Sequence, residues 1–294
     1  MSTLAVPGTA VHGPAAVPAT TPAGRSRTAS GPHSSFSGIL RGEWIKVLSL
    51  RSTWWALAST AALMTLVSLA AALSLDAMSK DPVMAPAVAQ MHGAEVISGG
   101  FQIGMLTIAV LGALFITGEY STGMIHSTFA AVPARLPVLA AKAVVLVALT
   151  TGVTVVGVTL AYLVTMPQLS QYDLVPTLGD PATWRVLGGT VYFLVSAALF
   201  SLGVGTLLRS TAATVTVAPT VLLLLPGILS FISLDWVETI VSYLPLPASA
   251  AFLTTGETSV RGADLTAQAG ILVIAAYAVV PIVAAAVALR RRDA

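Results

Sequence analysis

Six long apolar stretches dominate the pattern of hydrophobic and polar positions along this sequence. Each approaches or exceeds the roughly 20 residues with which an α-helix crosses the hydrocarbon core of a bilayer. None contains a charged residue or a histidine away from its ends. The pattern predicts an all-α polytopic membrane protein with six transmembrane helices, at about residues 54–75, 100–117, 138–166, 186–208, 212–234 and 269–289.

The composition argues against several other classes of protein. Of the 294 residues, 56% are hydrophobic and 9% are charged, whereas soluble domains are roughly 25% charged. A mean hydropathy of +0.89 leaves the apolar surplus no aqueous surface to occupy. The net charge is only +2, and no basic cluster is interleaved with aromatic residues, so no nucleic-acid partner is expected. The absence of cysteine excludes disulfides and thiolate metal sites.

Residues 1–35 are rich in Ala, Pro, Thr, Ser and Gly and contain no apolar run long enough for a signal peptide. They are predicted to form a disordered cytoplasmic tail. No second domain is visible after it, so residues 36–294 are expected to form a single six-helix transmembrane domain.

The basic residues fall mainly on one side of the predicted spans. Cytoplasmic loops retain Lys and Arg, so both termini are predicted to be cytoplasmic. An even number of spans also requires the termini to share a side. The basic residues on that side are Arg25, Arg27, Arg41, Lys46, Arg51, Arg135, Lys142, Arg209, Arg290, Arg291 and Arg292, out of 14 in the chain.

A helix is predicted just before the first span, over residues 36–51. Its apolar residues share one broad face, so it should lie in the headgroup plane of the membrane. Glu43 falls on that apolar face, where a carboxylate needs water, or a cation or backbone donor from a neighbouring element. The alternative is a surface pair between Glu43 and Lys46. The candidate residues of this helix are Glu43, Trp44, Lys46 and Arg51.

Residues 118–137, between the second and third spans, are too polar for a membrane and too long for a plain hairpin. Ser121 or Thr122 can cap a short cytoplasmic helix here, and Pro133 would end it. Its apolar residues at helical spacing would make it a docking site for a partner. The alternative is an ordered loop without that role. The residues at helical spacing are Met124, Ile125, Thr128 and Phe129.

The segment after the fifth span, residues 235–267, begins with a helix-capping pattern and is broken at Pro245 and Pro247. Two short helices separated by prolines predict a re-entrant or interfacial hairpin on the outer side. Pro219 and Pro226 should kink the fifth span itself.

Two glycines at the start of the second span, Gly100 and Gly104, form a small-xxx-small pair. This pair is interpreted as a site of plain close packing between helices.

Residues that carry chemistry in enzymes and carriers are missing. No G-x-x-x-x-G-K-[ST] motif occurs, so the chain is not expected to hydrolyse ATP. The apolar stretches hold no Ser, His and Asp set and no carboxylate pair, which makes an enzyme the weakest class. Uncharged spans argue against coupling to an ion gradient. No metal site is expected, and haem within the bundle is excluded because the histidines lie outside the spans, at His12, His33, His92 and His126.

Several motifs together resemble those of membrane subunits of type-2 ABC exporters, in particular the small six-span permeases of high-GC bacteria. Before the first span stand Gly42-Glu-Trp-Ile-Lys46 and Ser49-Leu-Arg-Ser-Thr-Trp-Trp55, similar to the elbow helix of that family. Gly118-Glu-Tyr-Ser-Thr-Gly123, followed by Val132-Pro-Ala-Arg135 and Ala141-Lys142, is similar to its coupling-helix segment. The resemblance covers residues 38–290. The tail before Phe36 is not part of it.

The resemblance implies a bacterial plasma-membrane permease that forms a homodimer, or a heterodimer with a similar permease. It implies docking of two cytosolic ATPase subunits, which would carry the ATP and magnesium, and no cofactor in this chain. The expected contacts with the ATPase are Glu119, Tyr120, Met124, Ile125, Phe129 and Arg135.

The sequence does not select one substrate. Uncharged walls suit amphipathic drugs, lipids or peptides. Two other classes stay open: a non-transporting binding, immunity or scaffold protein of the membrane, and a passive channel.

Overall fold

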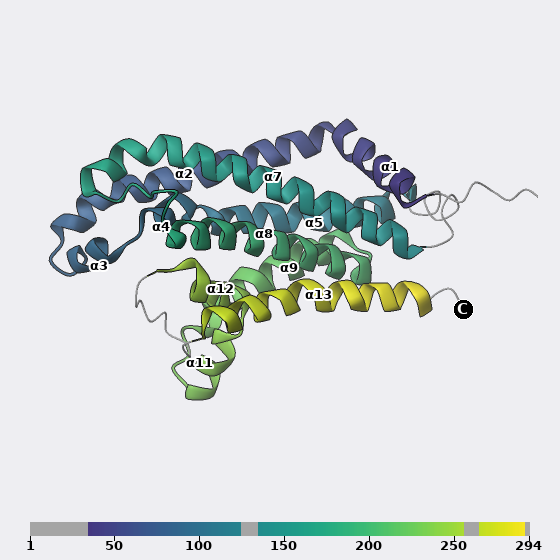
Figure 1. Ribbon diagram of the computed structural model, residues 1–294. Helices are drawn as coiled ribbons and strands as arrows, with labels where there is room; N and C mark the ends of the chain where they lie inside the picture. Colours follow the sequence, from purple (N-terminus) through teal and green to yellow (C-terminus); the bar gives the residue numbers. More distant parts are fainter. Residues whose placement is uncertain (1–34, 125–134, 256–264, 292–294) are drawn as a thin grey trace, which may run out of the picture. The chain divides into compact units, whose positions relative to one another are not determined.

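A computed structural model describes residues 35–124, 135–255 and 265–291, and these residues form helices and no strands (Figure 1). All of them belong to one compact unit. Residues 1–34, which make up most of the predicted tail, lie outside the described residues. Ser35 is described and caps the first helix, where its Oγ accepts a hydrogen bond from the Gly38 amide at 3.2 Å.

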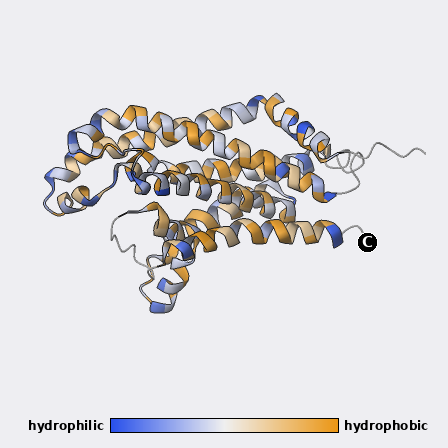
Figure 2. Cartoon of the chain, viewed as in Figure 1, coloured by the Kyte–Doolittle hydropathy of each residue, from blue (hydrophilic) through white to orange (hydrophobic). Residues whose placement is uncertain are grey.

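Six helical segments within the described residues are long and apolar enough to cross a membrane. Hydrophobic residues cover most of their length, and hydrophilic residues gather toward the ends (Figure 2). The all-helical class and the number of spans are therefore confirmed, and they support a multi-pass membrane protein. The segments are α2 (Arg51–Lys80), α4 (Gly93–Ser98) with α5 (Phe101–Ser121), α7 (Arg135–Leu169), α8 (Pro181–Leu208), α9 (Thr211–Pro219) with its continuation to Leu229, and α13 (Ala267–Arg291).

The central helix of this unit is α8, which contacts α5, α7, α12 and α13. Of its most apolar 18 residues, 61% are buried, against 17% for α13. Side chains of α2, α5, α7, α8 and α13 meet in one apolar core. Because α2, α13 and the fifth span bury little of their apolar surface, their outer faces are suited to hydrocarbon.

The helices define two ends of the unit (Figure 1). At one end, here called the elbow end, α1 (Phe36–Ser49) contacts α7 and α2. The chain leaves this end along α2 and returns to it along α5. The opposite end holds the short helices α3 (Ala85–Gln90), α4, η1 (Ser170–Tyr172), α11 (Asp235–Ser242) and α12 (Pro245–Leu253). The two short helices predicted after the fifth span are thus present as α11 and α12.

The fifth span is interrupted where the sequence places Pro219. A π-helical segment, Thr220–Leu224, joins α9 to α10 (Leu225–Leu229). A wider turn accommodates the missing amide of a proline, so an irregularity at this position is expected. The span ends at Leu229, however, and not at residue 234 as predicted.

The short helices α3 and α4 were not predicted. α4 is largely buried and contacts α2, α7 and α8. Ser68 of α2 fixes it, since its Oγ donates to the Ile97 carbonyl at 2.7 Å and accepts from the Gly100 amide at 3.2 Å.

The glycine pair at the start of α5 packs against α2. A Cβ on Gly100 would overlap the backbone of Met64, and one on Gly104 would overlap its side chain. The interpretation of this pair as a close-packing site is therefore confirmed, with the contact made inside the chain.

The predicted cap of the helix between the second and third spans is wrong, although Met124, the last described residue before the gap, is again helical. Ser121 does not cap a new helix but is the last residue of α5, and Thr122 follows as its C-cap. Both hydroxyls donate to the Gly118 carbonyl, at 3.0 and 2.8 Å, and so finish the last turn of α5. Most of the predicted docking helix, including Ile125, Thr128, Phe129 and Pro133, lies outside the described residues.

Candidate functional site

The helix α1 docks on α7 through a small apolar contact. Val47 is buried against Val145 and Leu149 of α7, while Leu40 packs at the edge of the same cluster. Glu43 lies one turn before Val47 and is buried with it. The predicted apolar face of α1 therefore faces the protein at these positions.

Four charged side chains meet where α1, α5 and α7 come together, and they are called the charge cluster here. Lys142 of α7 donates to Glu43 Oε2 at 2.6 Å and to Glu119 Oε1 at 2.7 Å. Lys46 of α1 donates to Glu43 Oε1 at 2.8 Å and to Glu119 Oε1 at 2.5 Å. Each lysine thus bonds both carboxylates, and the cluster closes into a ring with no net charge.

The cluster is largely removed from solvent. Lys142 is only 1% exposed and Glu119 is 6% exposed. Burying single charges in this way is strongly unfavourable, but a closed set of two acids and two bases compensates the loss of hydration. The ring of Phe115 adds to this, with its centroid 5.3 Å from the Lys142 ammonium.

The two cluster residues on α1 stay charged at neutral pH. Burial raises the pKa of Glu43, but the ammonium groups of Lys142 and Lys46 outweigh burial and hold it below its usual value. For Lys46, burial lowers the pKa, and hydrogen bonds to Glu119 and Glu43 more than offset this and raise it. The charged forms of Glu43 and Lys46 are therefore the stable ones.

A cavity of about 360 Å³ borders the cluster between α1, α2 and α5. Its walls combine apolar side chains such as Leu111 and Leu114 with all four cluster residues. Within the described residues, Glu119 Oε2 is buried without a hydrogen-bond partner. One carboxylate oxygen of the ring is thus left open to a further donor.

The structure brings together three of the predicted site residues, Glu43, Lys46 and Glu119. Glu43 was expected to need water, or a cation or backbone donor from a neighbouring element, and Lys142 of α7 provides the cation. The alternative pair between Glu43 and Lys46 forms as well. Glu119, predicted to contact a partner, bonds the two lysines inside the chain. Trp44 and Arg51 are exposed and lie outside the cluster.

Of the remaining predicted contacts, Tyr120, Met124 and Arg135 are described and lie at the same end. Tyr120 and Arg135 border a small space beside Lys142, and the Arg209 guanidinium lies 5.5 Å from the centre of the Tyr120 ring. Met124 is exposed at the last described position before the gap. Ile125 and Phe129 lie outside the described residues.

Lys142 was missed as a site residue, although the sequence contains a signal for it. Its neighbours three and four positions away on the helix are all apolar and buried: Val138, Leu139, Val145 and Leu146. A lysine surrounded in this way needs a buried acid. By sequence, Lys142 stands among the basic residues that flank the spans and in the motif similar to the coupling-helix segment, but it is not among the candidate contacts.

The opposite end contains a second set of polar contacts. His92 Nε2 lies 2.7 Å from Asp180 Oδ2, and His92 Nδ1 accepts from the Ala94 amide, which places the ring proton on Nε2. The Ala182 amide and His92 hold the pKa of Asp180 below its usual value. Glu95 accepts from the amide and hydroxyl of Thr255. These contacts tie α4 to the start of α8 and the end of α12.

No group of three or more metal-ligating side chains occurs in the part of the chain that the structure describes.

No model of a protein family matches this chain, and no curated protein is significantly similar to it.

Proposed function

We propose that this protein is the membrane subunit of a type-2 ABC exporter, energised by separate ATPase subunits that dock between the second and third spans. The substrate is an amphipathic or lipid-like compound or drug. In this proposal the protein lies in a bacterial plasma membrane with both termini and the elbow end in the cytoplasm. α1 serves as the interfacial elbow helix, and α11 with α12 as the outer re-entrant hairpin.

The charge cluster is the observation that carries the proposal. It joins α1 to the end of α5 and the start of α7, the two helices that flank residues 122–134. A push on that segment would therefore reach α1 through two short ion pairs, Lys46–Glu119 and Lys142–Glu43. Such a connection is suited to a membrane subunit whose spans are tilted between two states by ATPase subunits outside the bilayer.

The distribution of apolar surface supports a dimer in the same proposal. The spans that bury least are α13, the fifth span and α2, at 17%, 22% and 28% of their most apolar 18 residues. Part of this exposed surface would face a second permease, and the rest would face lipid.

The test is affinity purification of the tagged chain from its native host, followed by assay of the ATPase activity that copurifies. We expect a nucleotide-binding subunit to accompany the chain. Arg135→Ala and Phe129→Ala should each lower its recruitment by about tenfold, the effect of removing an interface side chain worth about 1.4 kcal/mol. The matched control is Arg185→Ala at the opposite end, which should leave recruitment unchanged.

Three outcomes would contradict the proposal. Recruitment that survives deletion of residues 121–129 would remove the docking site. ATP hydrolysis by the purified chain alone would place the engine inside it. Ion conductance by the purified chain without ATP would favour a channel.

A further inference from the structure

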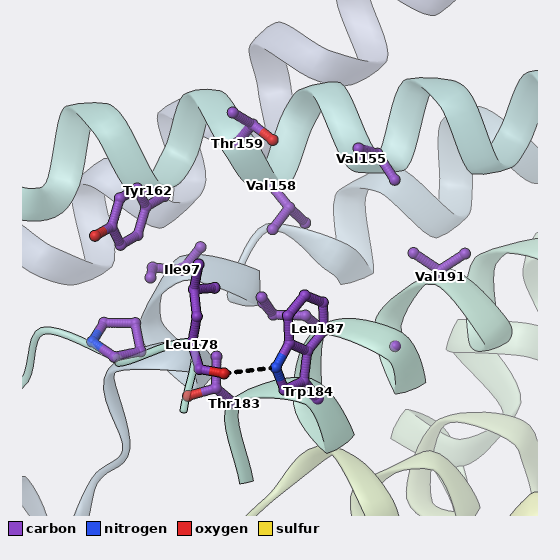
Figure 3. A pocket seen from close by; sticks show the side chains of 12 residues that line it. Ile97, Val155, Val158, Thr159, Tyr162, Leu178, Thr183, Trp184, Leu187 and Val191 are labelled. Atoms are coloured by element: carbon purple, nitrogen blue, oxygen red, sulfur yellow. Dashed lines mark hydrogen bonds between the residues drawn. The ribbon is translucent and has the colours of Figure 1, made fainter. Parts of the chain in front are cut away.

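An apolar cavity of about 460 Å³ lies between α7 and α8, in the half of these helices nearer the opposite end (Figure 3). Its lining runs from Tyr162 to Val155 on α7 and from Trp184 to Val191 on α8. Seven residues of α-helix rise about 10 Å, so the cavity is elongated along the helix axes. The volume falls in the range of roughly 300–1,000 Å³ typical of small-molecule sites.

The cavity opens on the outer surface of two spans. Val155 and Trp184 are each more than half exposed, and Gly188 between them has no side chain to close the gap. A Cβ on Gly188 would meet nothing within 4 Å. Open space therefore extends directly beside this position of α8.

Water is a poor occupant for this cavity. The lining contains no charged residue, and the indole N–H of Trp184 already donates to the Leu178 carbonyl at 2.8 Å (Figure 3). The lining has hydroxyl groups at Thr159, Tyr162 and Thr183, and among the described residues Thr183 Oγ1 is buried without a hydrogen-bond partner. A buried water needs two to four polar partners, however, and the rest of this lining is mostly apolar. An empty space would forfeit dispersion contacts along its whole lining. An apolar occupant needs no polar partners and restores the dispersion contacts with the lining.

We propose that this cavity holds the acyl chain of a membrane lipid. Hydrocarbon chains are the solvent around exposed spans, and the surface next to the cavity, at Val156, Leu160 and Leu163, is apolar and exposed. Trp184, in the first turn of α8, has the side chain that concentrates at headgroup level. The headgroup lies beside Trp184, and the chain runs along the groove toward Val191. This lipid site requires only that the protein lies in a bilayer, and it does not depend on the proposed transport function.

The test uses the full chain in nanodiscs that contain a phospholipid with a photoactivatable diazirine on its acyl chain. After illumination, proteolysis and mass spectrometry locate the labelled residues. We expect label concentrated on the cavity residues of α7 and α8, above the level on the exposed face of α13. Gly188→Leu places a side chain in the hollow and should reduce the labelling toward the α13 level.

Gly152→Leu is the matched control, because Gly152 is also exposed with open space around it but lies outside the cavity lining. It should leave the pattern unchanged. Gly188→Val replaces Gly188→Leu if the larger side chain prevents folding, as judged by thermal unfolding.

Other occupants give different results. Even labelling over α2, α7, α8 and α13, or labelling that persists in both Gly188 variants, would overturn the proposal. A second copy would be revealed by a Val155→Cys variant, since the chain has no other cysteine. Crosslinking of two copies through that position, in place of lipid labelling, would assign the groove to a dimer.

Discussion

Replacing Lys142 with methionine is expected to destabilise the protein by about 3–5 kcal/mol, the usual cost of leaving a buried charge without its partner. The substitution keeps the length of the side chain and its apolar packing. It leaves Glu43 and Glu119, both buried, to share the single ammonium of Lys46. The loss therefore reports the electrostatic role of Lys142 and not a cavity.

The matched control is Lys80→Met. Lys80 also bonds an acid, Asp76, at 2.7 Å, but its side chain is 74% exposed. An ion pair in water contributes little, so this variant should unfold like the parent protein. Thermal unfolding in detergent, followed by tryptophan fluorescence, compares the three proteins. Equal effects of the two substitutions would show that burial of the cluster does not matter.

Gly100→Ala is expected to destabilise the protein by about 1–3 kcal/mol, the usual cost of overpacking. The added Cβ would overlap the Met64 backbone, and backbone atoms cannot move aside as a side chain can. Separation of α2 from α5 would also disturb the hydrogen bond from the Gly100 amide to Ser68.

Gly152→Ala should have the opposite sign. Gly152 lies inside α7 with open space around its Cα. Alanine is favoured over glycine in a helix interior by about 0.5–1 kcal/mol, so this variant should be as stable as the parent protein or more so. The same unfolding measurement applies to both variants. A Gly100→Ala variant as stable as Gly152→Ala would contradict the close packing of α5 on α2.

The spans were predictable because hydropathy and length report membrane crossing directly. Their ends were less predictable, since a helix continues as long as its backbone hydrogen bonds are satisfied. α5 continues past the end of its apolar run to Ser121, with two hydroxyls bonded to the Gly118 carbonyl. The same residues were read as the start of a new helix because hydroxyl side chains cap both helix ends.

The charge cluster was half predictable. Because Glu43 falls on the apolar face of its helix, the sequence indicates that its carboxylate has a polar partner. It did not identify Lys142, because the contact joins residues 99 positions apart. The short helices α3 and α4 were missed for a similar reason. α4 is fixed by contacts with the distant residues Ser68 and Thr255, and α3 packs against α2. Neither helix has a long periodic pattern of its own.

The cavity between α7 and α8 could not be anticipated from the sequence. Gly188 resembles any other glycine in an apolar helix until the neighbouring helix is in place. Gly188 and the exposed Trp184 line a cavity only because α7 packs beside α8.

The central claim is that buried ion pairs fasten α1 to α5 and α7, and a charge swap tests it most directly. Glu43→Lys and Lys142→Glu should each destabilise the protein strongly, because each leaves three like charges and one opposite charge in a buried site. The double variant restores two acids and two bases. The double variant should be destabilised by about 1–3 kcal/mol less than the sum of the two single destabilisations, which is the coupling expected for residues in contact. Additive losses, with no recovery in the double variant, would show that Glu43 and Lys142 do not form a buried pair.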